Sequence, residues 1–216
     1  MSPDNERLRA FSPIEAPDAR VLILGSMPSR ESLERQRYYA HPRNQFWMLI
    51  CRLLNEPCPE DYLARRRILL AHGIALWDVV DSCKREGSAD SAIREVVVNE
   101  FGPFFAVHPC IHTIIFNGEK AYQLYEKYVL NSVTWIELSL IRLPSTSPAY
   151  AVSFEDKLKA WQLGFEKAGL ILYKGGEESE RYFNRLNNKQ FALELLHVCY
   201  RPRPQVENRP RPQLNT

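Results

Sequence analysis

Short runs of almost uninterrupted apolar residues constrain the fold of this 216-residue chain most strongly. They occupy residues 20–24 (RVLIL), 74–80 (IALWDVV) and 112–116 (HTIIF), and a fourth candidate, residues 136–143, runs into Pro144. A strand with one solvated face alternates apolar and polar residues, whereas a strand buried on both faces of a parallel sheet is apolar throughout. The runs therefore predict a parallel sheet that is covered on both sides.

Helical patterns fill the intervals between these runs. Apolar residues recur at helical spacing in residues 45–54, 61–71 and 119–129. The best-defined helix spans residues 153–168, with Ser153 at the predicted N-cap and a glycine directly after its end. Strands that alternate with helices indicate right-handed crossovers. The predicted fold is α/β, a three-layer α/β/α arrangement with a short central parallel sheet.

Length and composition indicate one folded domain with an appendage. Hydrophobic residues make up 45% of the chain and charged residues 25%, which is ordinary for a globular protein. We assign residues 1–172 to the domain and residues 173–200 to a linker and an amphipathic helix. Residues 201–216 contain the sequence RPRPQ twice, and this Pro/Arg-rich tail is predicted to be disordered.

Several functional classes are disfavoured by the sequence. No apolar run approaches the roughly 18 residues that span a membrane, and the charged residues 2–9 do not resemble a secretory signal. We therefore expect a cytoplasmic protein, or a nuclear one in a eukaryote. The five cysteines form no CxxC pair, which favours reduced thiols over a disulfide framework or a metal site. The net charge of +2 does not by itself indicate nucleic-acid binding.

Ligands of open parallel sheets bind beyond the carboxyl ends of the strands, so the segments there carry the functional prediction. The sequence GSMPS follows the first strand at residues 25–29, Asn117 and Gly118 follow the third, and LPSTSPA lies at residues 143–149. Such residues bring backbone N–H groups close to a phosphate or a base, although they are also ordinary in turns. Residues 30–43 mix arginines with aromatic residues, which suits either nucleic-acid contacts or a solvated loop.

Four motifs together resemble the uracil-DNA glycosylase superfamily. They are GSMPS, YYAHPRNQFW at residues 38–47, FNG at residues 116–118 and LPSTSPA, in the order and spacing of the mismatch-specific uracil/thymine-DNA glycosylases. The first motif contains GSMP where the mismatch enzymes have GINPG. This motif and residues 75–93 are most similar to those of the hypoxanthine-DNA glycosylase group. The resemblance covers residues 21–161. It implies a monomeric DNA repair enzyme that needs no metal or cofactor and hydrolyses the glycosidic bond of a flipped, deaminated base in double- or single-stranded DNA.

The resemblance assigns catalysis to two asparagines. The catalytic asparagine of the mismatch enzymes is replaced here by Ser26, so Asn44 is expected to position the attacking water. Asn117 is expected to read the edge of the base and to assist catalysis. Either asparagine could instead cap the helix that follows it.

The remaining predicted contacts concern the base and the DNA backbone. Phe46 is expected to form the aromatic floor of the base pocket, unless it packs in the core of the helix that begins there. Ser29 stands where this group usually has glycine, which predicts a constrained backbone. The predicted base contacts are Ser26, Met27, Phe46 and Asn117, and the predicted DNA contacts are Pro28, His41, Ser145, Thr146, Ser147 and Pro148.

Two other functions remain open at this point. One is a mismatch-specific uracil/thymine glycosylase, against which Ser26 and the polar cluster from Asp78 to Ser91 argue. The other is a non-catalytic DNA-binding module with the same fold, against which the retained Asn44 and Asn117 argue. Strand cleavage is not expected, because it needs an amine nucleophile and the four motifs contain no lysine.

Overall fold

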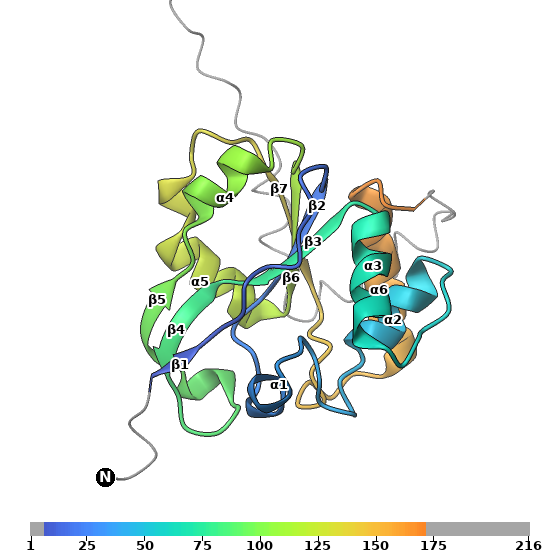
Figure 1. Ribbon diagram of the computed structural model, residues 1–216, viewed down its shortest axis with the longest axis horizontal. Helices are drawn as coiled ribbons and strands as arrows, with labels where there is room; N and C mark the ends of the chain where they lie inside the picture. Colours follow the sequence, from blue (N-terminus) through green and yellow to red (C-terminus); the bar gives the residue numbers. More distant parts are fainter. Residues whose placement is uncertain (1–6, 172–216) are drawn as a thin grey trace, which may run out of the picture.

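The computed structural model describes residues 7–171, whose centre is a four-stranded parallel sheet (Figure 1). Its strands are β2 (Val21–Gly25), β3 (Ile74–Asp78), β6 (Thr113–Asn117) and β7 (Ser139–Leu143). They are ordered β3-β2-β6-β7, and each neighbouring pair is parallel. All residues of β2, β3 and β6 are buried, which confirms the parallel sheet predicted from the apolar runs.

Helices cover both faces of this sheet, so the predicted three-layer architecture is confirmed. One layer contains α2 (Phe46–Leu53), α3 (Tyr62–Ala71) and α6 (Phe154–Lys167). The opposite layer contains α4 (Phe101–Val107) and α5 (Glu119–Tyr128) (Figure 1).

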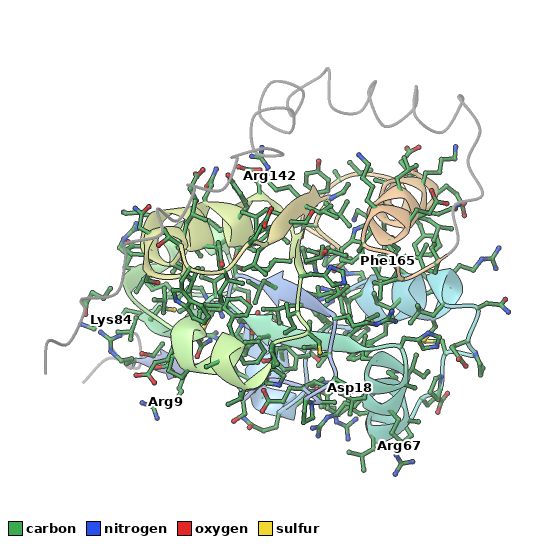
Figure 2. All side chains as sticks on the ribbon, turned by 90° about the horizontal axis from the view of Figure 1, so that it is seen from above. Arg9, Asp18, Arg67, Lys84, Arg142 and Phe165 are labelled. Atoms are coloured by element: carbon green, nitrogen blue, oxygen red, sulfur yellow. The ribbon has the colours of Figure 1, made fainter. Side chains whose placement is uncertain are left out.

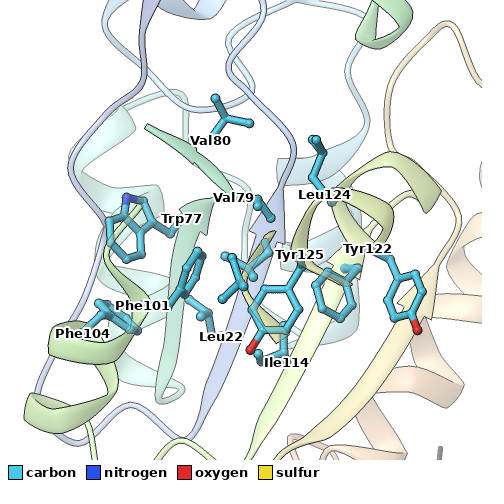
Figure 3. Packing of buried hydrophobic residues seen from close by; sticks show 14 of the residues in the cluster. Leu22, Trp77, Val79, Val80, Phe101, Phe104, Ile114, Tyr122, Leu124 and Tyr125 are labelled. Carbon is cyan, nitrogen blue, oxygen red and sulfur yellow. The ribbon is translucent and has the colours of Figure 1, made fainter. Parts of the chain in front are cut away.

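Alternate residues of each strand enter two separate cores. Val21 and Ile23 belong to the core on the side of α2, α3 and α6. Leu22 packs on the other side with Ile114 and the aromatic side chains of α4 and α5 (Figure 3). Because successive strand residues point to opposite faces, both sets must be apolar, which explains the unbroken runs in the sequence.

The run at residues 74–80 does not form one strand, contrary to the sequence prediction. It divides into β3 and β4 (Val80–Lys84), and β4 pairs antiparallel with β1 (Leu8–Arg9) and β5 (Arg94–Val98) in a second sheet. The backbone N–H groups of Val79 and Val80 donate to the carbonyls of Gly25 and Ser26, at 2.9 and 3.1 Å. These bonds to the end of β2 turn the chain out of the central sheet after Asp78.

Two α-helices and two short 3-10 turns were not predicted. Helix α1 (Arg30–Arg35) has six residues, and α4 contains a glycine and a proline, so neither has a clear helical pattern. The 3-10 turns are η2 (Asp90–Ala92) and η3 (Leu130–Ser132).

Helix α6 begins as its sequence predicts, because the Ser153 hydroxyl accepts a hydrogen bond from the Asp156 N–H at 3.1 Å. Exposed charged residues such as Arg9 and Arg67 lie at the periphery of the molecule (Figure 2). None of the helices within residues 7–171 is both long and apolar enough to cross a bilayer. The predicted linker, C-terminal helix and Pro/Arg-rich tail lie outside the described residues.

Candidate active site

The strand order places a crevice between β2 and β6. The chain leaves β2 toward β3 on one side and returns to β6 on the other, which makes this the topological switch point where parallel sheets bind ligands. A cavity of about 390 Å³ lies there, within the size range of small-molecule sites. Its walls come from all four sequence motifs and include Ser26, Met27, Pro28, Tyr39, Asn44, Asp78, Asp90, Asn117, Lys120, Ser145, Thr146, Ser147 and Tyr150.

The loop after β2 is held in shape by the segment that follows β4. The Ser26 hydroxyl donates to Asp90 Oδ1 at 2.8 Å, and a buried guanidinium nitrogen of Arg85 donates to the Pro28 carbonyl. Ser26 and Met27, which the sequence predicted as base contacts, line the cavity, and Pro28 lies in the same wall.

Ser29 does not have the constrained backbone that the sequence predicted. Its φ of −66° and ψ of 163° are ordinary extended values, and its hydroxyl accepts from the Ser32 N–H at 3.2 Å. A serine is therefore compatible with this position, because it acts as the N-cap of α1.

The predicted Phe46 does not line the cavity, whereas Tyr39 does, together with Tyr38 and Tyr150. Phe46 is fully buried beneath Tyr39, and the two rings stack with their centroids 4.0 Å apart. Phe46 lies on the inward face of α2, where it also packs against Trp161. Tyr39 lines the cavity, and its backbone is left-handed, with φ of 53°, an uncommon conformation for a non-glycine residue.

Asn44 lines the cavity, and its side chain also bonds the first turn of a helix. The N-cap residue of α2 is Gln45, which makes no side-chain cap bond, but Asn44 Oδ1 accepts a hydrogen bond from the Phe46 N–H at 3.0 Å. We call this bond the Asn44 cap, because it satisfies an N–H group that the helix leaves free. The carbonyl oxygen retains a second lone pair, and Nδ2 has no hydrogen-bond partner among residues 7–171. The cap fixes the carboxamide and leaves it capacity for a water molecule.

Asn117 is bound to the loop that follows β7. Its Nδ2 donates to Thr146 Oγ1 at 2.9 Å, and its Oδ1 accepts from the Thr146 N–H at 2.8 Å. The side chain does not cap α5, whose N-cap is Gly118. Thr146 is completely buried, so its hydroxyl braces Asn117 and does not reach a DNA phosphate, contrary to the sequence prediction.

The other predicted DNA contacts lie at or near the rim. Ser145 and Ser147 line the cavity and are partly exposed, and Pro148 is exposed next to them. His41 is partly exposed but does not line the cavity, and its Nδ1 faces the Arg43 N–H at 3.1 Å. Helix α6 supports the loop that follows β7, because Trp161 Nε1 donates to the Pro144 carbonyl at 2.8 Å.

Comparison with known proteins agrees with this geometry. The family model of the uracil DNA glycosylase superfamily matches residues 12–165, which include every residue that lines the cavity. The chain belongs to this superfamily.

Two curated relatives within the uracil DNA glycosylase superfamily are named hypoxanthine DNA glycosylase. The Methanosarcina barkeri protein is 31% identical over 160 residues, which cover 74% of this chain and 98% of the relative. The Methanosarcina acetivorans protein is 38% identical over 114 residues, which cover 52% of this chain and 72% of the relative. A solution structure from M. acetivorans, provisionally described as a uracil DNA glycosylase, aligns with a TM-score of 0.66 at 32% identity and covers 76% of this chain and 99% of its own.

This superfamily member has cavity residues that sequence reasoning did not assign. Tyr39 stands inside the second motif, but the neighbouring Phe46 matched the expected position better. Lys120 and Tyr150 lie just beyond the third and fourth motifs, so the motifs did not include them. The sequence placed Asp78 in a polar cluster that borders the pocket or braces a loop, but assigned it no catalytic role, although its position as the last residue of β3 marks it as a site residue.

Asp78 and Asp90 make the inner wall of the site acidic. Burial, followed by the charge of Asp90, raises the pKa of Asp78 to about 8, and Arg85 opposes this effect. A carboxyl in this state is mostly protonated at neutral pH. None of the His, Cys, Asp and Glu side chains in the described part of the chain form a group of three or more that could hold a metal ion.

Proposed function

We propose that this protein is a DNA glycosylase that hydrolyses the N-glycosidic bond of hypoxanthine and leaves an abasic site. The observation that carries the proposal is that Asn44 and Asn117 line one cavity at the switch point of the sheet. The names of the relatives support the substrate, and the cavity suits a single flipped base.

The residues of the cavity divide the reaction between them. The target nucleotide leaves the base stack, which costs a few kcal/mol and least at a weak pair such as one formed by hypoxanthine. The Tyr39 ring offers the base a flat wall, and Asn117 presents a rigid amide to its edge because Thr146 fixes both of its polar atoms. Asn44 holds the water that attacks the sugar as positive charge develops there.

We further propose that the enzyme acts as a monomer on double- or single-stranded DNA in the cytoplasm, or in the nucleus of a eukaryote. The serines at the rim are placed where the phosphates of a flipped nucleotide would pass. Gel filtration of the free protein, and excision from matched single-stranded and duplex oligonucleotides, test these two points.

We propose that the enzyme does not cut the DNA strand, although Lys120 lies in the cavity wall. Strand cleavage of this kind proceeds through a Schiff base between an amine and the sugar. Borohydride added during the reaction should trap no covalent complex. A trapped complex that disappears in Lys120→Gln would show a lyase activity.

The substrate is tested with duplexes that carry one deoxyinosine, deoxyuridine, deoxyxanthosine or G·T mismatch. Alkali converts each abasic product into a strand break, so the cleaved fraction measures base release. We expect the deoxyinosine duplex to be cleaved fastest. Release of uracil alone would favour the mismatch-specific alternative, and tight binding without release under single-turnover conditions would favour a non-catalytic module.

A further inference from the structure

Two buried polar groups of the cavity lack hydrogen-bond partners among the described residues. They are the Oδ2 atom of Asp78, whose residue is 3% exposed, and the hydroxyl of Tyr39, although the Asn117 side chain lies close enough to this hydroxyl to lower its pKa. Buried polar atoms are nearly always paired, and an unpaired one costs roughly 1–3 kcal/mol. Both residues line the cavity, so a ligand there could supply the missing partners.

The backbone brings these two groups together over Gly25. Asp78 lies opposite Gly25 in the parallel register of β2 and β3. A Cβ atom on Gly25 would collide with Asp78 Oδ1 and would lie 3.0 Å from the Tyr39 hydroxyl oxygen. The carbonyl of Asp78 also accepts a hydrogen bond from Asn99 Nδ2 at 2.8 Å. Asp78 Oδ1 and the Tyr39 hydroxyl oxygen thus both lie within about 3 Å of the same point above Gly25, at the end of the central sheet.

The surroundings of Asp78 favour a carboxylic acid over a carboxylate. Burial and Asp90 raise its pKa, and the guanidinium of Arg85 lowers it without cancelling their effect. The phenols of Tyr38, Tyr39 and Tyr62 also lie within electrostatic range, and burial raises their own pKa values, so they remain neutral. Burial raises the pKa of Asp90, and the Lys120 ammonium in the same wall acts on Asp90 to lower it. A neutral carboxyl can donate one hydrogen bond, which a carboxylate cannot do.

We propose that Asp78 is the general acid of this enzyme, donating a proton to N7 of the flipped hypoxanthine while the Tyr39 hydroxyl donates a hydrogen bond to O6. This role rests on the glycosylase function proposed above. The arrangement of donors fits the base, because N7 and O6 are adjacent acceptors on one edge of the ring. Adenine presents an N6 amino donor next to N7 instead, so the same pair of donors disfavours the undamaged precursor of hypoxanthine.

The proposed step is balanced in protons and electrons. The C1′–N9 bond breaks, its electron pair remains on the base, and the proton from Asp78 moves to N7, so that neutral hypoxanthine departs. The water held by Asn44 adds its oxygen to C1′ and releases one proton to solvent. The Asp78 carboxylate then regains a proton from solvent, and the enzyme returns to its starting state.

The pH dependence of single-turnover release from the deoxyinosine duplex tests the role of Asp78. The wild-type rate should fall as pH rises through about 8, the pKa of Asp78. Asp78→Asn keeps the shape of the side chain and a hydrogen-bond donor, but it cannot give up a proton. At pH 7 this variant should therefore release hypoxanthine about 10²-fold more slowly, and its rate should not fall as pH rises through about 8. The matched control is Asp81→Asn, because Asp81 lies three residues further along and outside the cavity wall. This control should keep both the wild-type release rate and its decrease at alkaline pH.

A second measurement needs no variant and stays informative even if Asp78→Asn fails to fold. A duplex with 7-deaza-2′-deoxyinosine has a C–H group in place of N7, so it cannot accept the proton. The wild-type enzyme should cleave it about 10²-fold more slowly than deoxyinosine, and a folded Asp78→Asn should lose nothing further on it.

The outcomes separate this role from the function on which it rests. Failure of the wild type to release hypoxanthine from ordinary deoxyinosine would overturn the proposed function. Rapid release with full activity on the 7-deaza substrate would overturn the role of Asp78 alone. An Asp78→Asn variant that is slower, but whose release rate still falls as pH rises through about 8, would show that Asp78 only supports the shape of the site.

Discussion

Replacement of Asn44 gives the sharpest test of the catalytic assignment, because the structure gives this residue two separable roles. As a cap, its Oδ1 bonds the Phe46 N–H at 3.0 Å. Loss of such a cap costs about 1 kcal/mol of folding free energy, which corresponds to a melting temperature about 2–4 °C lower for a domain of this size. A protein with ordinary stability of about 5–15 kcal/mol remains almost entirely folded after that loss.

As the group that positions water, Asn44 should matter far more for rate than for folding. Asn44→Ala is expected to slow release of hypoxanthine about 10²-fold or more, equivalent to at least about 2.7 kcal/mol of activation free energy. Asn44→Ser can restore the cap but not the carboxamide, so it should melt like the wild type and remain slow. The assay is single-turnover release from a deoxyinosine duplex, with DNA affinity and melting temperature measured on the same samples. Full activity of Asn44→Ser would refute the reasoning and reduce Asn44 to a cap.

Three further predictions concern Asn117, Gly25 and the C-terminal residues. Asn117→Ala removes both bonds to Thr146 and should lower the unfolding free energy by about 1–3 kcal/mol and weaken release. Thr146→Val keeps the bond from the backbone N–H at position 146, so its unfolding free energy, measured by calorimetry, should lie between those of Asn117→Ala and the wild type. Equal melting temperatures for the wild type and both variants would show that the bonds between Asn117 and Thr146 do not stabilise the fold. Gly25→Ala should greatly slow release, because its Cβ collides with Asp78, whereas Gly102→Ala meets no atom within 4 Å and should stay fully active. Equal rates for these two variants would show that the site tolerates the collision. Removal of residues 177–216 should weaken DNA binding at most modestly and leave the single-turnover rate unchanged; a large fall in that rate in a folded truncation would contradict this.

Much of the fold followed from local sequence patterns. The apolar runs predicted the buried parallel strands because a strand covered on both faces cannot carry polar side chains. The serine at position 153 located the start of α6 because capping depends on a bond three residues away. Helix α4 was missed because its glycine and proline weaken the local signal, and its stability comes from three buried phenylalanines that pack in the core.

The candidate site was predicted less completely, because its geometry depends on contacts between distant segments. The motifs identified Asn44 and Asn117, but not the bonds that tie Asn117 to Thr146, 29 residues away. Tyr39 and not Phe46 lines the cavity because the Tyr39 ring stacks over Phe46, which is fully buried, and no sequence pattern indicated this contact.

The sequence by itself determined the strands of the central parallel sheet, the family resemblance and the segments that meet at the carboxyl edge of that sheet. These features depend on side-chain type and spacing, which are properties of short stretches of chain. Only the tertiary structure decided which polar groups face the cavity and in what state. Asp78 has an ordinary carboxyl in the sequence, and the fold raises its pKa to about 8 because it removes the group from water and places Asp90 nearby.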